Sequence, residues 1–268
     1  MRRDWILPLG FAGVGLLLYG AIVETEQLVG EKKTLRLPNW PKSHNGYKVG
    51  FIADLHLRGA QELALTETAL EWLLKQNCDA IAIAGDILPW WREDSIEFAT
   101  YGLRLLADFP ANVVIVPGNH DYYGGDASWL RPLIEGYGAH YLQNQMVEIG
   151  GVQWVGIDSA NESQHDPDLA MKMLDPSKPS ITLWHEGDFV DELPSGTQLM
   201  LSGHSHGGQF TTPWGWAPMT VRGGSKYLRG FYPDAPTPLY VTRGLATTGP
   251  PSRLFCRPEV SVLTLVGN

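Results

Sequence analysis

Residues 47–56 read YKVGFIADLH, an apolar run that ends in an aspartate and a histidine. The run from Tyr47 to Ala53 is typical of a buried strand, because its residues are almost all apolar. In an extended segment only residues two positions apart point the same way, so Asp54 and His56 present two ligand-type side chains to one place. The stretch therefore predicts a buried strand whose carboxyl end carries a polar site.

Four further segments place ligand-type residues directly after a strand-like run. They are Gly85-Asp86, Gly118-Asn119-His120-Asp121, Trp184-His185-Glu186 and Gly203-His204-Ser205-His206. Ligands of open α/β sheets bind at the carboxyl ends of the strands, so this recurring placement predicts one shared site. The glycines permit tight turns and a close approach of the backbone next to the ligands.

Strands and helices alternate in the first half of the chain, and strands dominate the second half. Strands are expected at 47–53, 79–84, 113–116, 152–157, 180–184, 198–201, 239–241 and 260–265, and helices at 61–76, 96–107 and 127–137. This order predicts an α/β domain with two packed β-sheets. We expect the domain to span 47–268, after an N-terminal segment at 1–24 and a polar stalk and domain edge at 25–46.

The composition is that of a globular protein with an acidic surface. Hydrophobic residues make up 44% of the chain and charged residues 18%, which excludes a disordered protein. The net charge of -9 argues against nucleic acid as a partner, because phosphates need a basic surface. Metal ions can still supply positive charge locally. Cys78 and Cys256 are the two cysteines, too few for a disulfide framework or a thiolate metal site.

The N-terminus carries an apolar run from Trp5 to Val23. About 19 residues at about 1.5 Å each come close to the roughly 30 Å of a bilayer core, so the run predicts one transmembrane helix that anchors the domain. A cleaved signal peptide and a buried core helix are the alternatives. Tyr19 is bulky where a signal peptide needs a small residue before the cut, and the run has no polar face.

The charges around this run predict the orientation of the anchor. Arg2 and Arg3 precede it and acidic residues follow it, which favours a cytoplasmic N-terminus and an extracytoplasmic domain at a bacterial inner membrane. Lys32, Lys33 and Arg36 oppose that orientation from the other end. The paired arginines are also compatible with a twin-arginine export signal. The sequence indicates no oligomeric state.

The ligand-type residues outnumber the needs of one metal ion. Three Asp or Asn oxygens and four imidazoles call for two ions, and a shared carboxylate lets two ions lie about 3.5–4 Å apart. Mixed nitrogen and oxygen donors without sulfur suit Mn, Fe or Zn better than Ca. Each segment alone is common by chance, but five in this order after strands are not. The sequence predicts two divalent transition-metal ions, with Mn as the first choice.

Taken together, these segments resemble the signature of the calcineurin-like metallophosphoesterase superfamily, from roughly Val49 to the C-terminus and with no element missing. The resemblance implies an αββα sandwich of two mixed β-sheets flanked by helices. It implies a first metal held by Asp54, His56, Asp86 and His206. It also implies a second metal held by Asp86, Asn119, His185 and His204, with Asp86 as the bridge. His120 would be the catalytic histidine, oriented by Asp121.

The expected chemistry is hydrolysis of a phosphate ester or pyrophosphate. A hydroxide that bridges two cations is available near neutral pH and attacks phosphorus, while the cations absorb charge on the phosphoryl oxygens. The departing alkoxide needs a proton, which a histidine such as His120 can supply. A carboxylate beside that histidine would fix its tautomer and favour its charged form.

Three further stretches resemble one branch of this superfamily. They are GHSHGGQ at 203–209, YVTRG at 240–244 and CRPEV at 256–260. The branch holds small bacterial membrane-associated or exported phosphodiesterases and is similar to one form of UDP-2,3-diacylglucosamine pyrophosphatase. The better-known cytosolic form of that enzyme carries arginine where His120 stands here, so this chain departs from it.

Tryptophans follow two of the ligand segments and predict an apolar rim. Trp90 and Trp91 come soon after Asp86, and Trp214 and Trp216 come soon after His206. An apolar rim beside a phosphate site favours an acyl chain or the membrane interface as its partner. The alternative is that these residues pack the loops onto the domain. A basic group near the rim could hold a remote phosphate; the candidates are Arg222, Arg92, Lys226 and Arg229.

Three functions follow in order of preference. The first is hydrolysis of a membrane-associated or lipid-linked phosphate, such as UDP-2,3-diacylglucosamine. The second is a membrane-anchored phosphoprotein phosphatase, which would be expected to show an open basic cleft. The third is an inactive binding scaffold, which the intact set of ligands disfavours.

Overall fold

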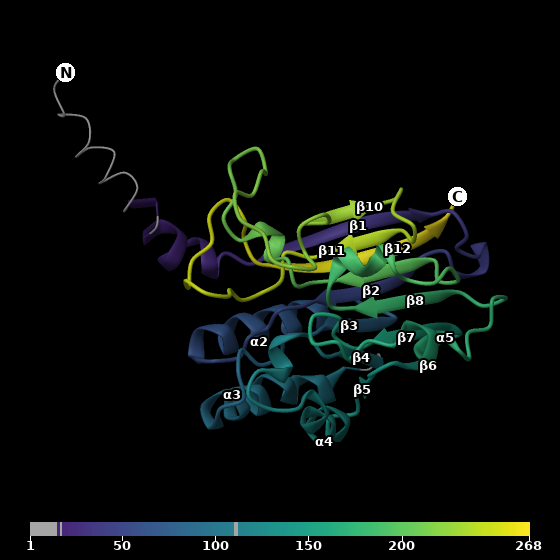
Figure 1. Ribbon diagram of the computed structural model, residues 1–268, viewed down its shortest axis with the longest axis horizontal. Coiled ribbons are helices and arrows are strands. Elements are labelled where there is room, and N and C mark those ends of the chain that lie inside the picture. The colour runs from purple at the N-terminus through teal and green to yellow at the C-terminus, as the bar shows by residue number, and fades with distance from the viewer. Residues whose placement is uncertain (1–14, 17, 110–111) are drawn as a thin grey trace.

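The computed structural model describes residues 15–16, 18–109 and 112–268, which form two six-stranded sheets packed face to face (Figure 1). The first sheet has the order β1 (Val29–Leu37), β12 (Glu259–Gly267), β2 (Tyr47–Ile52), β3 (Ala80–Ala84), β4 (Asn112–Val116), β5 (His140–Tyr141). The second has the order β10 (Gly230–Tyr232), β11 (Leu239–Val241), β9 (Leu199–Ser202), β8 (Ser180–Trp184), β7 (Val152–Ile157), β6 (Gln145–Ile149).

Both sheets are mixed. In the first sheet β2, β3, β4 and β5 run parallel, whereas β12 is antiparallel to β2 and parallel to β1. In the second sheet β7, β8, β9 and β11 run parallel, with β6 and β10 antiparallel at the two edges. The predicted α/β fold with two packed mixed sheets is confirmed. Parallel strands also bring their carboxyl ends to one edge of each sheet, where ligands collect.

Helices cover the outer faces of the sandwich. Three helices lie on the first sheet, and α5 lies on the second (Figure 1). Their bounds are Ala60–Leu74 for α2, Glu93–Leu103 for α3, Arg131–Gly136 for α4 and Pro167–Met171 for α5. Leu70 and Leu73 of α2 pack on Ile81 and Ile83 of β3, because apolar residues three apart share one face of a helix. The layer order is therefore helix, sheet, sheet, helix.

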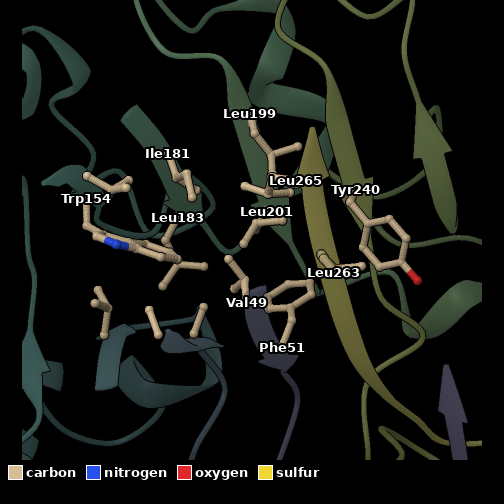
Figure 2. Close-up of a cluster of buried hydrophobic side chains, with 14 of the residues drawn as sticks. Val49, Phe51, Trp154, Ile181, Leu183, Leu199, Leu201, Tyr240, Leu263 and Leu265 are labelled. Carbon is tan, nitrogen blue, oxygen red and sulfur yellow. The ribbon is translucent and has the colours of Figure 1, made fainter. Parts of the chain in front are cut away.

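The main core is the apolar layer between the two sheets (Figure 2). Val49 and Phe51 of β2 lie toward Leu183 of β8 and Leu201 of β9, all fully buried. Burying each such side chain contributes roughly 1.5–3 kcal/mol, so this layer holds the sheets at a fixed separation.

The stalk expected at 25–46 contains an edge strand. Residues 29–37 form β1, which pairs with β12 along its whole length. Leu35 and Leu37 are buried, whereas residues nearer its start alternate between half-buried and exposed. A strand with one solvated face alternates apolar and polar residues, and here polar residues dominate the first half, so the sequence pattern indicated a linker.

The predicted N-terminal anchor falls mostly outside the described residues, because 1–14 and 17 are not among them. Residues 15–16 and 18–22 are helical, with Leu16, Leu18 and Ile22 exposed. Within the described part of the chain, every helix falls short of the length and hydropathy that a membrane span requires.

Candidate metal centre

The predicted ligands come together where five strands end. Asp54 and His56 follow β2, Asp86 follows β3 and Asn119 follows β4, all in the first sheet. The second sheet contributes His185 after β8 and a pair of histidines, His204 and His206, after β9. All seven side chains are buried. The site therefore lies across the boundary between the two sheets.

A first group of four ligands surrounds the carboxylate of Asp86. Its members are Asp54, His56, Asp86 and His206, whose ligand atoms all lie within 4.8 Å of one another. The Nε2 atom of His56 lies 3.4 Å from Oδ2 of Asp86 and 3.3 Å from Nε2 of His206. Oδ1 of Asp54 lies 3.5 Å from the same His206 nitrogen. Four donor atoms thus converge on one point.

A second group shares Asp86 with the first. It consists of Asp86, His185 and His204. The Oδ2 atom of Asp86, which faces His56, also lies 3.3 Å from Nε2 of His185. Nδ1 of His204 lies 3.2 Å from that same nitrogen. One carboxylate oxygen therefore faces both groups, which is the arrangement of a bridging ligand.

Backbone carbonyls select the tautomers of three histidines. Nδ1–H of His185 donates to Ala84 O at 2.5 Å, and Nδ1–H of His206 donates to Ala246 O at 3.1 Å. Nε2–H of His204 donates to Arg222 O at 2.7 Å. In each ring the other nitrogen faces the cluster and is the atom that would bind a metal. Such partners are the usual support of metal-binding histidines.

Asn119 and His120 complete the wall of the pocket. The Nδ2 group of Asn119 donates to Tyr123 Oη at 2.9 Å, and its buried Oδ1 has no partner among the described residues. Backbone N–H of His120 donates to Oδ1 of Asp86 at 2.8 Å. The pocket, about 300 Å³, is lined by Asp86, Asn119, His120, Tyr123, Asn161, Glu162, His204, His206, Val221, Arg222 and Thr248. An orphaned amide oxygen in such a wall fits a metal ligand.

The backbone is strained at the ligands. Five of them adopt positive φ: Asp54 (57°), His56 (39°), Asp86 (54°), His204 (67°) and His206 (49°). Residues other than glycine rarely adopt this conformation, and in proteins it gathers at functional sites. A Cβ at Gly118 would collide with Oδ1 of Asp86, and one at Gly203 would lie 2.8 Å from Oδ2 of Asp54. Both glycines are thus required for this close approach.

Burial governs the charges of the cluster. It raises the pKa of Asp54 to about 7 and lowers the pKa of His56 to about 3, in spite of the neighbouring Asp86. Burial disfavours the charged forms of Asp86 and His185 too, but their mutual attraction wins. The pKa of Asp86 lies well below its ordinary value and that of His185 well above. Two cations would neutralise the clustered carboxylates and use the lone pairs of the imidazoles.

The residues present therefore fit a dinuclear divalent metal site. The donor set consists of carboxylate, amide and imidazole groups without a thiolate. Such donors suit divalent transition metals, although they do not select among Mn, Fe and Zn.

Asp121 does not orient His120 as the sequence predicted. Its carboxylate accepts from the backbone N–H of Leu88 at 2.9 Å and of Gly118 at 2.8 Å. Nδ1 of His120 instead lies 2.9 Å from Pro89 O, a hydrogen bond in which the ring nitrogen donates. Adjacent residues in the short turn His120–Tyr122 point in different directions, so the buried Asp121 supports two loops while His120 lines the pocket.

The predicted rim divides into supporting and exposed residues. The lining of the metal pocket includes Arg222 but, among the described residues, none of the four tryptophans. Trp90 packs edge-on against Tyr123, and Trp91 donates from Nε1 to Asp121 O at 2.6 Å. Both support the His120 loop, which favours the packing alternative for this pair. Trp214 and Trp216 are 81% and 62% exposed, so they are available to a partner.

Sequence reasoning missed a buried arginine behind the first ligand group. The guanidinium of Arg253, fully buried, donates to carbonyl oxygens of the turn at 243–246, among them Ala246 O, which also accepts from His206. It also donates to Cys256 O at 3.0 Å. No local pattern marks this arginine, because its partners become neighbours only in the folded chain. Arg253 positions His206 through the backbone.

Glu186 was missed in its role although it lies within one of the quoted segments. Its buried carboxylate accepts from Ser159 Oγ at 2.6 Å and from the backbone N–H of Ala160 and Asn161, each at 3.1 Å. These bonds hold Asn161 at the pocket, where its Nδ2 donates to Arg222 O at 3.0 Å. Its position directly after His185 was the available signal.

Replacing Arg253 with methionine is expected to lower the free energy of unfolding by about 3 kcal/mol or more, because several buried carbonyls would lose a donor. Thermal unfolding followed by circular dichroism should show a midpoint about 6–12 °C lower. Arg104→Met is the matched control, since Arg104 is an exposed partner of Glu67 and should change the midpoint little. A midpoint for Arg253→Met equal to that of the control would contradict this role.

Comparison with known proteins places the site in a family context. A family model described as calcineurin-like phosphoesterase matches residues 47–208. The metallophosphoesterase YkuE of Bacillus subtilis is 26% identical, over 92% of this chain and 88% of that protein. The phosphodiesterase YaeI of Escherichia coli is 28% identical over 82% of each chain. The crystal structure of a dimetal phosphatase from Danio rerio superposes with a TM-score of 0.52 at 11% identity, over 82% of this chain and 93% of that one, a likeness of fold.

Proposed function

Because the chain belongs to the calcineurin-like phosphoesterase family and is a hydrolase acting on phosphoester bonds, we propose that it is a dinuclear metal phosphodiesterase. Its substrate is a membrane-associated or lipid-linked phosphate, of which UDP-2,3-diacylglucosamine is an example. One observation carries the dinuclear assignment: Oδ2 of Asp86 lies 3.4 Å from His56 Nε2 and 3.3 Å from His185 Nε2, so one carboxylate serves both ligand groups.

Each metal would be held by residues of both sheets. Asp54, His56, Asp86 and His206 would hold the first, and Asp86, Asn119, His185 and His204 would hold the second. When bound, the two ions supply an activated water and neutralise charge on the phosphoryl oxygens. The residues of the chain set the positions of the donor atoms before the substrate arrives, because backbone bonds already orient the imidazoles.

His120 is placed to serve the leaving group. Its Nδ1 donates to Pro89 O, so Nε2 is the ring nitrogen that can transfer a proton to a departing oxygen. The ring packs edge-on against His56, with 4.6 Å between the ring centroids, which keeps it beside the first ligand group. Arg222 lines the same pocket, and its guanidinium is the candidate partner for a second phosphate or an acidic headgroup.

A diester suits this pocket better than a monoester. A relative in Escherichia coli is named a phosphodiesterase. Glu162 lines the pocket, so a negative side chain opposes the additional charge of a monoester dianion. A phosphoprotein phosphatase would have to bind that dianion and remains the second candidate.

The metal-loaded chain is expected to hydrolyse bis(p-nitrophenyl) phosphate with a kcat/KM about tenfold or more above that for p-nitrophenyl phosphate, because Glu162 repels the dianion. Glu162→Gln should reduce this ratio of kcat/KM values, because it should raise kcat/KM for the monoester. Glu135→Gln, an exposed glutamate on α4, is the control and should leave the ratio unchanged. Faster turnover of a phosphoserine peptide than of any diester would replace this proposal with the phosphatase, and no turnover at full metal occupancy would favour a scaffold.

We also propose that the domain lies on the extracytoplasmic side of a bacterial inner membrane. The apolar run from Trp5 to Val23 with Arg2 and Arg3 before it supports an anchor, and the exposed Trp214 and Trp216 suit a membrane interface. An alkaline phosphatase reporter fused to the C-terminus should be active, and an inactive reporter with a stable fusion would reverse the orientation.

A further inference from the structure

An apolar groove adjoins the metal pocket. Its volume is about 300 Å³, and its walls include Phe210, Met219, Val221 and Pro250. His206, Val221 and Thr248 line both the groove and the metal pocket, so the two cavities are neighbours. A substituent on a phosphate ester bound in the metal pocket would therefore lie close to the groove.

Two polar side chains of the groove wall, Gln209 and Ser205, already have partners inside the protein. The side-chain amide of Gln209 donates to the carbonyls of Thr248 (2.9 Å) and Pro250 (3.3 Å), and its oxygen accepts from Thr248 N–H (3.0 Å). Ser205 Oγ donates to Leu228 O at 2.6 Å. A sugar or a base would find few free hydrogen-bonding groups here, so its own polar groups would lose their water without compensation. The wall fits an apolar occupant.

The rim of the groove leaves apolar side chains in solvent. Met219 is 78% exposed and Val221 is 38% exposed. Methionine is flexible and polarisable, and it adapts to apolar ligands of varied shape. Covering exposed apolar groups at the mouth of a cavity with an occupant lowers the free energy of the complex, in proportion to the apolar area removed from water.

Two loops that contribute residues to the groove lie at one end of the molecule. The loops at 209–229 and 242–258 project at the end near the helical residues 18–22 (Figure 1). Backbone N–H of Arg253 donates to Gly20 O at 3.2 Å, which joins the second loop to the N-terminal helix.

We propose that this groove holds an alkyl or acyl chain attached to the phosphate ester whose phosphorus lies at the metals. The inference rests on the proposed function and specifies which part of the substrate is recognised outside the metal site. The chain enters past Val221 and lies along Phe210 and Pro250, and Met219 closes over it. The exposed tryptophans Trp214 and Trp216 are absent from the lining, so they are left for another role.

Binding of a phosphonate series tests the groove without requiring turnover. Methyl-, propyl-, pentyl- and heptylphosphonate carry the same headgroup and a C–P bond that phosphoester hydrolysis does not cleave. This headgroup is a dianion that Glu162 disfavours equally in every member, so the comparison along the series measures chain length alone. They would be titrated by calorimetry into the full chain loaded with Mn²⁺ in nanodiscs, with empty nanodiscs as the blank. Affinity is expected to rise about fourfold per methylene, hence about 250-fold over the four methylenes from propyl to heptyl, with a heat capacity change that becomes more negative.

Met219→Gln should lower the affinity for heptylphosphonate about tenfold and leave that for methylphosphonate unchanged. Met173→Gln is the matched control, because Met173 is a comparably exposed methionine (76%) outside the groove. If all four phosphonates bind with equal affinity and only in the presence of Mn²⁺, the groove does not bind the chain, whereas the proposed metal site is retained. Headgroup binding that does not depend on Mn²⁺ would instead overturn the proposed function. A further outcome is that Met219→Gln binds lipid vesicles less tightly while the gain in affinity per methylene stays unchanged. That result would assign Met219 to contact with the bilayer surface and overturn the inference.

Discussion

Replacing Asp86 with alanine is expected to remove both metal ions and to lower kcat/KM by about 10³ or more. The physical reason is that one oxygen of this carboxylate faces a histidine of each ligand group, His56 and His185. Without that oxygen each ligand group loses its shared anion. Less negative charge then remains to balance the two cations. Elemental analysis of the purified chain gives the metal content, and diester hydrolysis gives the rate.

The pattern of losses distinguishes a bridge from an ordinary ligand. His56→Ala and His204→Ala should each lose about one ion, because each residue belongs to a single group. Asp79→Asn is the control, since Asp79 accepts from Lys48 N–H and does not belong to either ligand group. It should retain two ions. An Asp86→Ala chain that keeps one fully occupied ion would contradict the bridging role.

Replacing His120 with asparagine is expected to preserve metal content and lower kcat/KM by about 10²–10⁴ for alkyl esters, the usual contribution of a general acid. Asparagine can still donate to Pro89 O, as Nδ1 of His120 does, but it has no counterpart of Nε2. Aryl esters such as nitrophenyl diesters should lose much less, because nitrophenolate departs without a proton. The measurement is the slope of log kcat/KM against the pKa of the leaving group.

His140→Asn is the control for that experiment, because His140 belongs to β5 and does not line the metal pocket. Its slope should equal that of the original chain. If His120→Asn loses the same factor on every leaving group, His120 acts on binding or on the metals and not on the departing oxygen.

Local sequence patterns picked out the candidate ligands, which the fold brings together, because each is marked by its neighbours. Asp86 and His204 follow an apolar strand and a glycine, and the close approaches at Gly118 and Gly203 show why those glycines are needed. The central strands were equally clear, since a parallel strand buried on both faces is apolar throughout. These features depend on residues that are adjacent in the chain.

The features that were missed depend on contacts between distant residues. Arg253 lies in a segment whose sequence is typical of a loop, and its carbonyl partners come close to it only when the chain folds. β1 lies at an edge, so its polar residues concealed a strand. The pairing of Asp121 with His120 was wrong because proximity in the chain was taken for proximity of side chains, although the short turn directs them apart.

The two-sheet construction has a consequence for the way this catalyst can vary. Asp54, His56 and Asp86 follow strands of one sheet and His185 and His204 follow strands of the other, so the apolar layer between the sheets fixes how far apart these two sets of candidate ligands lie. Buried side chains of that layer, such as Phe51 and Leu201, thereby help to set the geometry of the candidate metal site. The exposed parts of the loops around the site lie outside this layer. Their sequence can therefore change while the interior keeps the positions of the candidate ligands constant.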